Sequence, residues 1–213
     1  MSGKIHLVRH AEGLHNLYND SSIPDAPLTQ RGFDFADDLG KRFVRERTNA
    51  VGLVISSPLR RAMQTSLTAF PRLLSSDLYP QDSGRGAHNG VDLELDANLQ
   101  ELDAVPCNTG SASADLVSQF PELTAKIQSL PQDWQDKTSL PPRTRRKALI
   151  LERISDALTA LKGSKADDVV VVTHSGVIGL LQEAPALDIE VAQWKTFSLT
   201  RDINGHLKLS EAG

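Results

Sequence analysis

Cationic side chains follow three separate apolar runs of the sequence. Arg9 and His10 come directly after IHLV, and His174 comes directly after DVVVVT. Arg60 and Arg61 lie four and five residues beyond VGLVIS. A guanidinium group forms paired, charge-assisted hydrogen bonds with phosphate oxygens, and a neutral imidazole can act as a nucleophile toward phosphorus. If the fold brings these side chains together, they form an anion pocket suited to a phosphoryl group.

The three apolar runs have the pattern of buried strands. The four consecutive valines that begin at Val169 are β-branched, and the run is too short for a helix, as is typical of a parallel strand covered on both faces. Strands are therefore expected at 5–8, 51–56, 91–95 and 168–173, with a terminal hairpin of 196–200 and 206–209. Helices are expected at 29–47, 58–74 and 145–161, and from Gly176 to a point before Pro185.

Alternating strands and helices predict an α/β fold with a mainly parallel central sheet and helices on both faces, a three-layer α/β/α arrangement. In such sheets, ligands bind beyond the carboxyl ends of the strands. Arg9, His10, Arg61 and His174 are therefore expected to meet at one edge of the sheet. The amides at Ser175, where a helix begins, would add donors to the same pocket.

Composition limits the class of protein. The 213 residues suit a single domain, residues 1–213, and the formal net charge of −4 provides no basic field for nucleic acid or an anionic membrane. A single cysteine, Cys107, excludes an intrachain disulfide and argues against a structural zinc site. No apolar run approaches ~18 residues, and the N-terminus lacks a signal-peptide pattern. We expect a cytoplasmic protein, and the oligomeric state is not predicted.

Four segments resemble the histidine phosphatase superfamily, also called the phosphoglycerate mutase-like family. LVRHAEGLHN is similar to the opening signature of that family, and DAPLTQRG is similar to the start of its first long helix. SSPLRRAMQT and VVVVTHSGVI are similar to its arginine element and its second-histidine element. All four segments occur in the expected order across about residues 5–180.

The resemblance implies a role for each matching residue. His10 would attack phosphorus and become a transient phosphohistidine, while Arg9, Arg61 and His174 would hold the transferring oxygens. Asn16 would bind phosphate from the loop that follows His10. A carboxylic acid would protonate the leaving oxygen, and LQELD makes Glu101 the candidate. The nearby carboxylates Asp96 and Asp103 are its rivals.

The sequence departs from the family pattern after Glu101. Many members continue with glycine and tryptophan, whereas this chain has AVPCNTGSAS. We expect an insertion at about residues 104–142, with one or two helices around 116–130, to form a lid over the leaving group. The run RTRRK at 143–147 is the charged start of an exposed helix or a site for a second acidic group. Trp134 and Trp194 are expected to pack in the core.

The expected function is hydrolysis of a small phosphomonoester with neither metal nor cofactor. A phosphoglycerate-type mutase and a noncatalytic phospholigand-binding protein on the same fold are the alternatives. A serine hydrolase using Ser175, with Asp188 or Asp202 and His206, lacks the required G-x-S-x-G turn. A metallohydrolase is weaker still, because His10 and His15 are five residues apart rather than the four that align two ligands on a helix.

Overall fold

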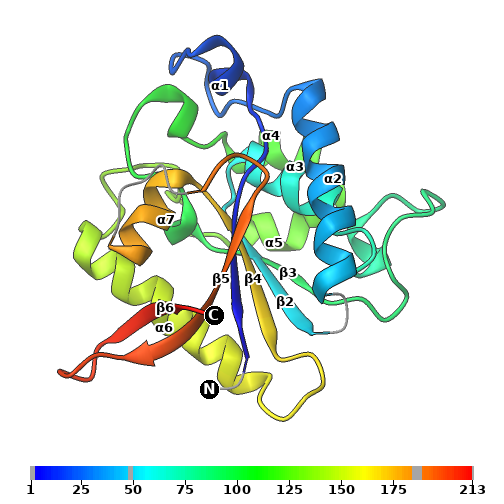
Figure 1. The fold of residues 1–213 in the computed structure, drawn as a ribbon. Coiled ribbons are helices and arrows are strands. Elements are labelled where there is room, and N and C mark those ends of the chain that lie inside the picture. Colours follow the sequence, from blue (N-terminus) through cyan, green and yellow to red (C-terminus); the bar gives the residue numbers. More distant parts are fainter. Residues whose placement is uncertain (1–2, 48–49, 184–188, 213) are drawn as a thin grey trace.

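The computed structural model describes residues 3–47, 50–183 and 189–212. A six-stranded sheet forms its centre, with strand order β3-β2-β4-β1-β5-β6 (Figure 1). The pairings among β1, β2, β3 and β4 are parallel, whereas β5 is antiparallel to both β1 and β6. The strands are β1 (Ile5–Arg9), β2 (Val51–Ser56), β3 (Leu93–Leu95), β4 (Asp168–Thr173), β5 (Trp194–Arg201) and β6 (Leu207–Glu211). The predicted, mainly parallel α/β fold is confirmed.

Helices cover both faces of this sheet. Val170 and Val172 of β4 face a core cluster that also holds side chains of α2 and α3, while Val169 and Val171 face a second cluster with α6 and α7. All four valines are fully buried, which explains the continuous apolar run in the sequence. The helices are α1 (Leu14–Tyr18), α2 (Gln30–Arg47), α3 (Arg60–Ala69), α4 (Ser113–Gln119), α5 (Thr124–Gln128), α6 (Arg143–Ala160) and α7 (Ser175–Gln182).

The boundaries of some elements differ from those predicted. The helix expected at 58–74 spans only Arg60–Ala69, because Pro71 disfavours helical geometry at Phe70. The strand expected at 91–95 is reduced to Leu93–Leu95, and Val91 makes only an isolated bridge to Leu74. The terminal hairpin is present, with β5 and β6 joined by a turn.

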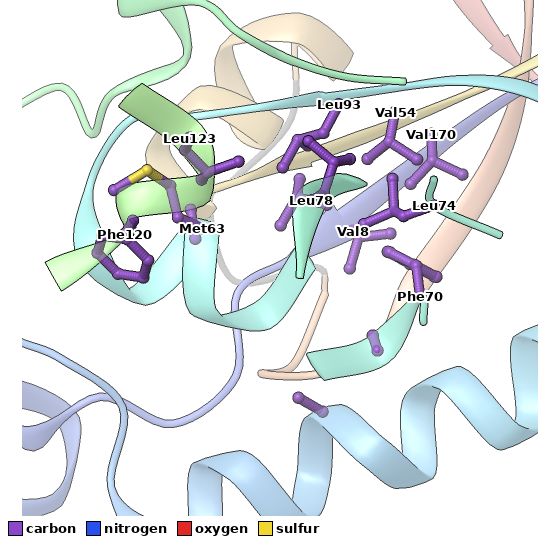
Figure 2. Close-up of a cluster of buried hydrophobic side chains, with 14 of the residues drawn as sticks. Val8, Val54, Met63, Phe70, Leu74, Leu78, Leu93, Phe120, Leu123 and Val170 are labelled. Atoms are coloured by element: carbon purple, nitrogen blue, oxygen red, sulfur yellow. The ribbon is translucent and has the colours of Figure 1, made fainter. Parts of the chain in front are cut away.

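The insertion at 104–142 is packed into the core. Phe120 and Leu123, at the two ends of the link between α4 and α5, lie around Met63 of α3 (Figure 2). Trp134 is also buried in this cluster, and Trp194 packs against its edge, so both tryptophans serve the packing expected of them. The insertion is thus anchored on the face of the sheet that α3 covers. Within the described residues, no helix combines the length and the apolar character needed to cross a bilayer.

Candidate active site

The end of β1 delivers Arg9 and His10 to the edge of the sheet. Arg9 pairs in register with Thr173 of β4, and the His10 amide donates to the Thr173 carbonyl across 2.9 Å. The His10 side chain is only 2% exposed. Its Nδ1 lies 2.7 Å from the carbonyl oxygen of Ala11. Because a carbonyl only accepts, Nδ1 carries the proton and Nε2 carries the lone pair.

Arg61 lies in the first turn of α3 and faces His10. Its Nε donates to His10 Nε2 across 3.2 Å. Its Nη1 donates to the carbonyl of Cys107 at 2.6 Å, and its Nη2 donates to Asn108 Oδ1 at 2.8 Å. The insertion therefore holds the two terminal nitrogens of this buried guanidinium, while Nε is directed at His10. Arg60 does not line the cavity that contains His10, and its backbone amide donates to Asp25 instead.

His174 follows β4 and lies beside His10, with 5.0 Å between the two ring centroids. Its Nε2 lies 2.8 Å from Ser57 Oγ, at the end of β2. This hydroxyl also accepts from the Leu59 amide at 3.3 Å, and donation of its proton to Nε2 would place the imidazole proton on Nδ1. Nδ1 of His174 is buried and has no partner among the described residues. An N–H at this position would be free to bind an oxygen of a ligand.

Both imidazoles are held in the neutral form. Burial is the largest cause that lowers the pKa of His10 well below its ordinary value, and the nearby charge of Arg61 is the next. The pKa of His174 is lowered well below its ordinary value by the same two causes in the same order. Arg9 and Arg61 remain cationic, because guanidinium groups keep their proton in proteins. The site thus combines fixed positive charge with an uncharged, basic imidazole nitrogen.

Glu101 lies across the cavity near the start of α7. Its Oε2 accepts hydrogen bonds from the Gly176 amide at 3.1 Å and from Ser175 Oγ at 3.4 Å. Its Oε1 accepts from the Leu102 amide at 2.8 Å. A Cβ at Gly176 would lie 2.2 Å from Oε1, so only glycine allows this approach of the carboxylate. Ser175 contacts Glu101 through its side-chain hydroxyl.

The rival carboxylates lie elsewhere. Asp96 caps a 3-10 turn by accepting from the Asn98 amide, and it is not among the residues that line the cavity. Asp103 lies at the cavity wall, where it pairs with Arg143 at 3.3 Å. Glu101 and Asp103 both line the cavity, and of these three carboxylates only Glu101 accepts from the Gly176 amide in the first turn of α7.

Asn16 lies on α1 at the cavity wall. Its Oδ1 accepts from the Gly13 amide at 3.0 Å, so its remaining donor is the amide nitrogen Nδ2. His15 lines the same cavity, with its ring centroid 5.7 Å from that of His10. Burial, followed by the charges of Arg61 and Arg9, lowers the pKa of His15 to about 4.

A cavity of about 810 Å³ is lined by Arg9, His10, His15, Asn16, Arg61 and Glu101. His174 is fully buried beside His10 and is not among the residues that line this cavity. Its far wall comes from the charged start of α6 and the end of α7. Arg143 and Lys147 point to this wall, where they pair with Asp103 and Glu183 respectively. Arg146 instead turns inward, and its Nε donates to the Asn98 carbonyl at 2.6 Å. The run RTRRK is thus both the start of a helix and, through Arg143, Thr144 and Lys147, part of the cavity.

Several residues that contact the site residues were not predicted from the sequence. Ser57 follows its strand directly, and that position could have marked it. Cys107 binds Arg61 through its backbone carbonyl, which every residue type has, so its role could not be predicted from its type. Asn108 lies in a segment that departs from the family pattern, so no motif indicated its contact with Arg61. Asp25, buried and at a φ of 38°, accepts from the Arg60 amide at 3.0 Å and from Ser111 Oγ at 2.8 Å. It ties the insertion to the start of α3.

His6 and two of the residues considered for a serine hydrolase, Asp202 and His206, lie apart from this site. His6 is buried within β1, 3.1 Å from Asp168. His206 is exposed on the hairpin turn, 3.5 Å from Asp202, and neither residue lines the cavity. Asp188 falls outside the described residues. In the described part of the chain, no group of three or more His, Cys, Asp or Glu side chains is arranged to hold a metal ion.

A family model described as "Histidine phosphatase superfamily (branch 1)" matches residues 5–75 and 84–207. The chain belongs to the histidine phosphatase superfamily. Phosphoglycerate mutase-like protein 1 of Arabidopsis thaliana is 29% identical over 203 residues, which cover 82% of this chain and 68% of that protein. Phosphoglycerate mutase-like protein 2 of the same plant is 39% identical over 100 residues, or 43% of this chain and 26% of that protein.

Solved structures of this superfamily have the same fold. A mycobacterial glucosyl-3-phosphoglycerate phosphatase superposes with a TM-score of 0.56 at 18% identity, covering 100% of this chain and 99% of that one. Phosphoserine phosphatase from Entamoeba histolytica superposes with a TM-score of 0.53 at 19% identity, covering 99% and 98%. At such identities the likeness shows the fold alone, and the chemistry of the site depends on the residues of this chain.

Proposed function

We propose that this protein is a metal-independent phosphatase that hydrolyses a small phosphomonoester through a phosphohistidine on His10. One observation carries the proposal. The imidazole is buried and neutral, its Nδ1 is fixed by the Ala11 carbonyl, and its Nε2 faces Arg61 in a cavity that Arg9 also lines. The His174 ring lies beside it, with 5.0 Å between the ring centroids. A nucleophile with its lone pair directed at a ring of cationic and N–H donors meets the needs of phosphoryl transfer.

The reaction has two steps. The Nε2 lone pair attacks phosphorus as the ester P–O bond breaks, and Glu101 gives its proton to the leaving oxygen. Arg9, Arg61, His174 and Asn16 bind the three phosphoryl oxygens while charge is redistributed among them. A water then attacks phosphohistidine and transfers a proton to the Glu101 carboxylate, which releases inorganic phosphate and restores Nε2. Ser175 and the α7 amides orient Glu101 in both steps.

The cavity favours a small, polar leaving group. Its volume of about 810 Å³ lies within the range of pockets for small organic ligands, so there is room beyond the phosphoryl group. Two cations and two carboxylates on the far wall would suit a leaving group with charged or hydroxyl substituents. The structural neighbours that are phosphatases of phosphoserine and glucosyl-3-phosphoglycerate support the same class of substrate.

A phosphomutase is the second candidate. Two observations favour it: the Arabidopsis relatives are named phosphoglycerate mutase-like, and Arg143 and Lys147 place additional cations in the cavity. A mutase must keep its phosphohistidine from water and retain a bisphosphate, whereas these cations are already paired with carboxylates. We therefore favour the phosphatase. Isomerisation of 3-phosphoglycerate faster than release of phosphate would reverse this order.

Turnover of p-nitrophenyl phosphate in the presence of EDTA tests the proposal. We expect the wild type to remain active and His10→Ala to lose turnover, whereas His206→Ala, on the exposed hairpin turn, should match the wild type. Phosphohistidine hydrolyses in acid and is stable in base, so the wild type should be quenched during turnover with alkaline SDS. This quench should trap phosphate on the protein, and His10→Ala should trap none. Loss of wild-type turnover in EDTA would contradict metal independence. Full activity of His10→Ala would refute the nucleophile, and an inactive wild type would favour a phospholigand-binding protein.

A further inference from the structure

Lys137, in the insertion, reaches the segment that carries Glu101. Its Nζ donates to the main-chain carbonyl of Glu101 at 3.1 Å and to the side-chain oxygen of Gln100 at 2.9 Å. Lys137 lies 36 residues beyond Glu101 in the chain, so these bonds join two segments that the fold brings together. They fix the backbone at the point where the Glu101 side chain begins.

Gln100 makes this connection rigid. Its side chain is fully buried, and its Nε2 donates to the Ala97 carbonyl at 3.0 Å and to the Trp134 carbonyl at 2.7 Å. Its Oε1 accepts from Lys137, so every polar atom of the amide group has a partner. Trp134 is itself held in the core, only 2% exposed. Two residues of the insertion, Trp134 and Lys137, therefore hold Gln100, the residue before Glu101, by hydrogen bonds.

The opposite side of the segment is held by α6. Arg146 donates to the carbonyl of Gln100 and, at 2.6 Å, to the carbonyl of Asn98. The Glu101 carboxylate is then oriented by Gly176 and Ser175 of α7. Backbone and carboxylate thus have separate supports, and Lys137 belongs to the set that holds the backbone.

We propose that Lys137 is a positioning residue for the proton donor: from the insertion, it fixes the Glu101 backbone so that the carboxylate meets the leaving oxygen. This inference rests on the proposed function, in which Glu101 is the acid. Lys137 is not among the residues that line the cavity, so it acts through Glu101 and not by contact with substrate. A shift of well under 1 Å in a proton donor is enough to slow a proton transfer.

The charge of Lys137 does not decide this role. Burial is the largest cause that lowers its pKa to about 7, and the charges of Arg146 and Arg61 lower it further, while Glu101 and Asp25 raise it. An ammonium has three N–H donors and a neutral amine has two, and the two hydrogen bonds to Gln100 and Glu101 need only two. Positioning by Lys137 should therefore operate on both sides of pH 7.

Leaving-group dependence tests the inference. A missing proton donor slows esters with basic leaving groups far more than esters of nitrophenol, because nitrophenolate leaves without a proton. We expect Lys137→Met to lower kcat/KM about tenfold for phenyl phosphate and less than about twofold for p-nitrophenyl phosphate. Lys137→Arg, which keeps the donors, should restore most of the loss. Lys126→Met removes another lysine of the insertion, one that pairs with Asp92, and serves as the matched control.

Two outcomes overturn the inference. An equal loss of kcat/KM for both esters would mean a general structural defect, and no loss in either ester would mean that Lys137 is dispensable. Glu101→Gln separates this failure from failure of the proposed function. If Glu101→Gln shows the leaving-group dependence and Lys137→Met does not, only the role of Lys137 is wrong. If Glu101→Gln itself shows none, the assignment of the acid is wrong and the inference falls with it.

Discussion

Arg61 donates from Nε to Nε2 of His10 across 3.2 Å, while the opposite nitrogen of that imidazole donates to the Ala11 carbonyl. The nitrogen proposed to attack phosphorus is therefore paired with an arginine before substrate arrives. A phosphoryl oxygen is a stronger acceptor than an imidazole, so binding of substrate should draw the Arg61 hydrogen bond to the phosphate and free the lone pair. The two terminal nitrogens of Arg61 donate to the Cys107 carbonyl and to Asn108, and we expect them to keep these partners when substrate binds.

Arg61→Lys should therefore fail although it keeps a positive charge. A lysine has a single nitrogen and cannot bind the Cys107 carbonyl, Asn108 and the phosphate with the fixed geometry of a guanidinium. We expect kcat/KM for p-nitrophenyl phosphate to fall by about 10²–10³-fold, as for the loss of one donor to a transition-state oxygen. Arg60→Lys, outside the cavity, is the control. Equal activity of the two variants would contradict the role of Arg61.

The activity should persist into mildly acidic solution. Burial and then Arg61 lower the pKa of His10, so the imidazole stays neutral and nucleophilic well below pH 6.5. We expect no loss of kcat/KM from His10 protonation between about pH 7 and about pH 5.5. An NMR titration of the His10 ring in the wild type and in Arg61→Met checks the cause, because removing the charge should raise the pKa. An unshifted pKa in the variant would contradict the electrostatic part of this argument.

Ser57→Ala should weaken the hold of His174 on phosphate. The Ser57 hydroxyl lies 2.8 Å from Nε2 of His174, and donation of its proton there would place the imidazole proton on Nδ1, a buried nitrogen with no partner among the described residues. Its removal should raise the inhibition constant for vanadate about tenfold and lower the free energy of unfolding by about 1 kcal/mol. Ser56→Ala, which loses hydrogen bonds to the Ser57 carbonyl and from Ser66 Oγ but none to His174, is the control. A similar rise in both variants would contradict the tautomer argument.

Gly176→Ala should displace the proposed acid. The added Cβ would lie 2.2 Å from Glu101 Oε1, so the carboxylate has to move away from the α7 amide. We expect kcat/KM for phenyl phosphate to fall at least tenfold more than that for p-nitrophenyl phosphate. The double variant with Glu101→Gln should be no slower than Glu101→Gln alone, because both changes act through one side chain. Additive losses would show that Gly176 acts in another way.

Stability should rise with pH through the titration of Lys137. The unfolded chain keeps this proton to about pH 10.5, whereas the native state releases it near pH 7. The unfolded state therefore binds more protons between these values, so the free energy of unfolding increases with pH in this window and is reduced below it. Urea denaturation of the wild type and Lys137→Met at about pH 7 and about pH 9.5 measures the effect. The increase in the free energy of unfolding should be smaller in Lys137→Met than in the wild type. An equal increase in both proteins would show that the titration of Lys137 is not its cause.

Much of the site was predictable because it follows strand ends. The apolar runs before His10 and His174 mark parallel strands, and the carboxyl ends of parallel strands meet at one edge of the sheet. Pairing of Val8 with Val172 then places the two histidines side by side. The family motifs named Arg61 rather than Arg60, and the fold directs Arg61 to His10. These features depend on local pattern and on one rule of topology.

The role of the insertion was not predictable in the same way. It was expected only as a lid, yet Cys107 and Asn108 hold Arg61 and Lys137 holds Glu101. Two of these contacts involve main-chain carbonyls, which every residue possesses, so no residue type marks them in the sequence. The contacts exist because Phe120 and Leu123 anchor the insertion in the core beside α3.

By itself, the sequence determined the sheet, the family and the cationic side chains that follow the carboxyl ends of its strands. Hydrophobic period and residue type carry that information locally. Only the tertiary structure decided that Glu101, and not Asp96 or Asp103, meets α7, and that Arg143 and Lys147 form the far wall of the cavity. These outcomes depend on distances between segments far apart in the chain, which packing sets and local pattern does not record.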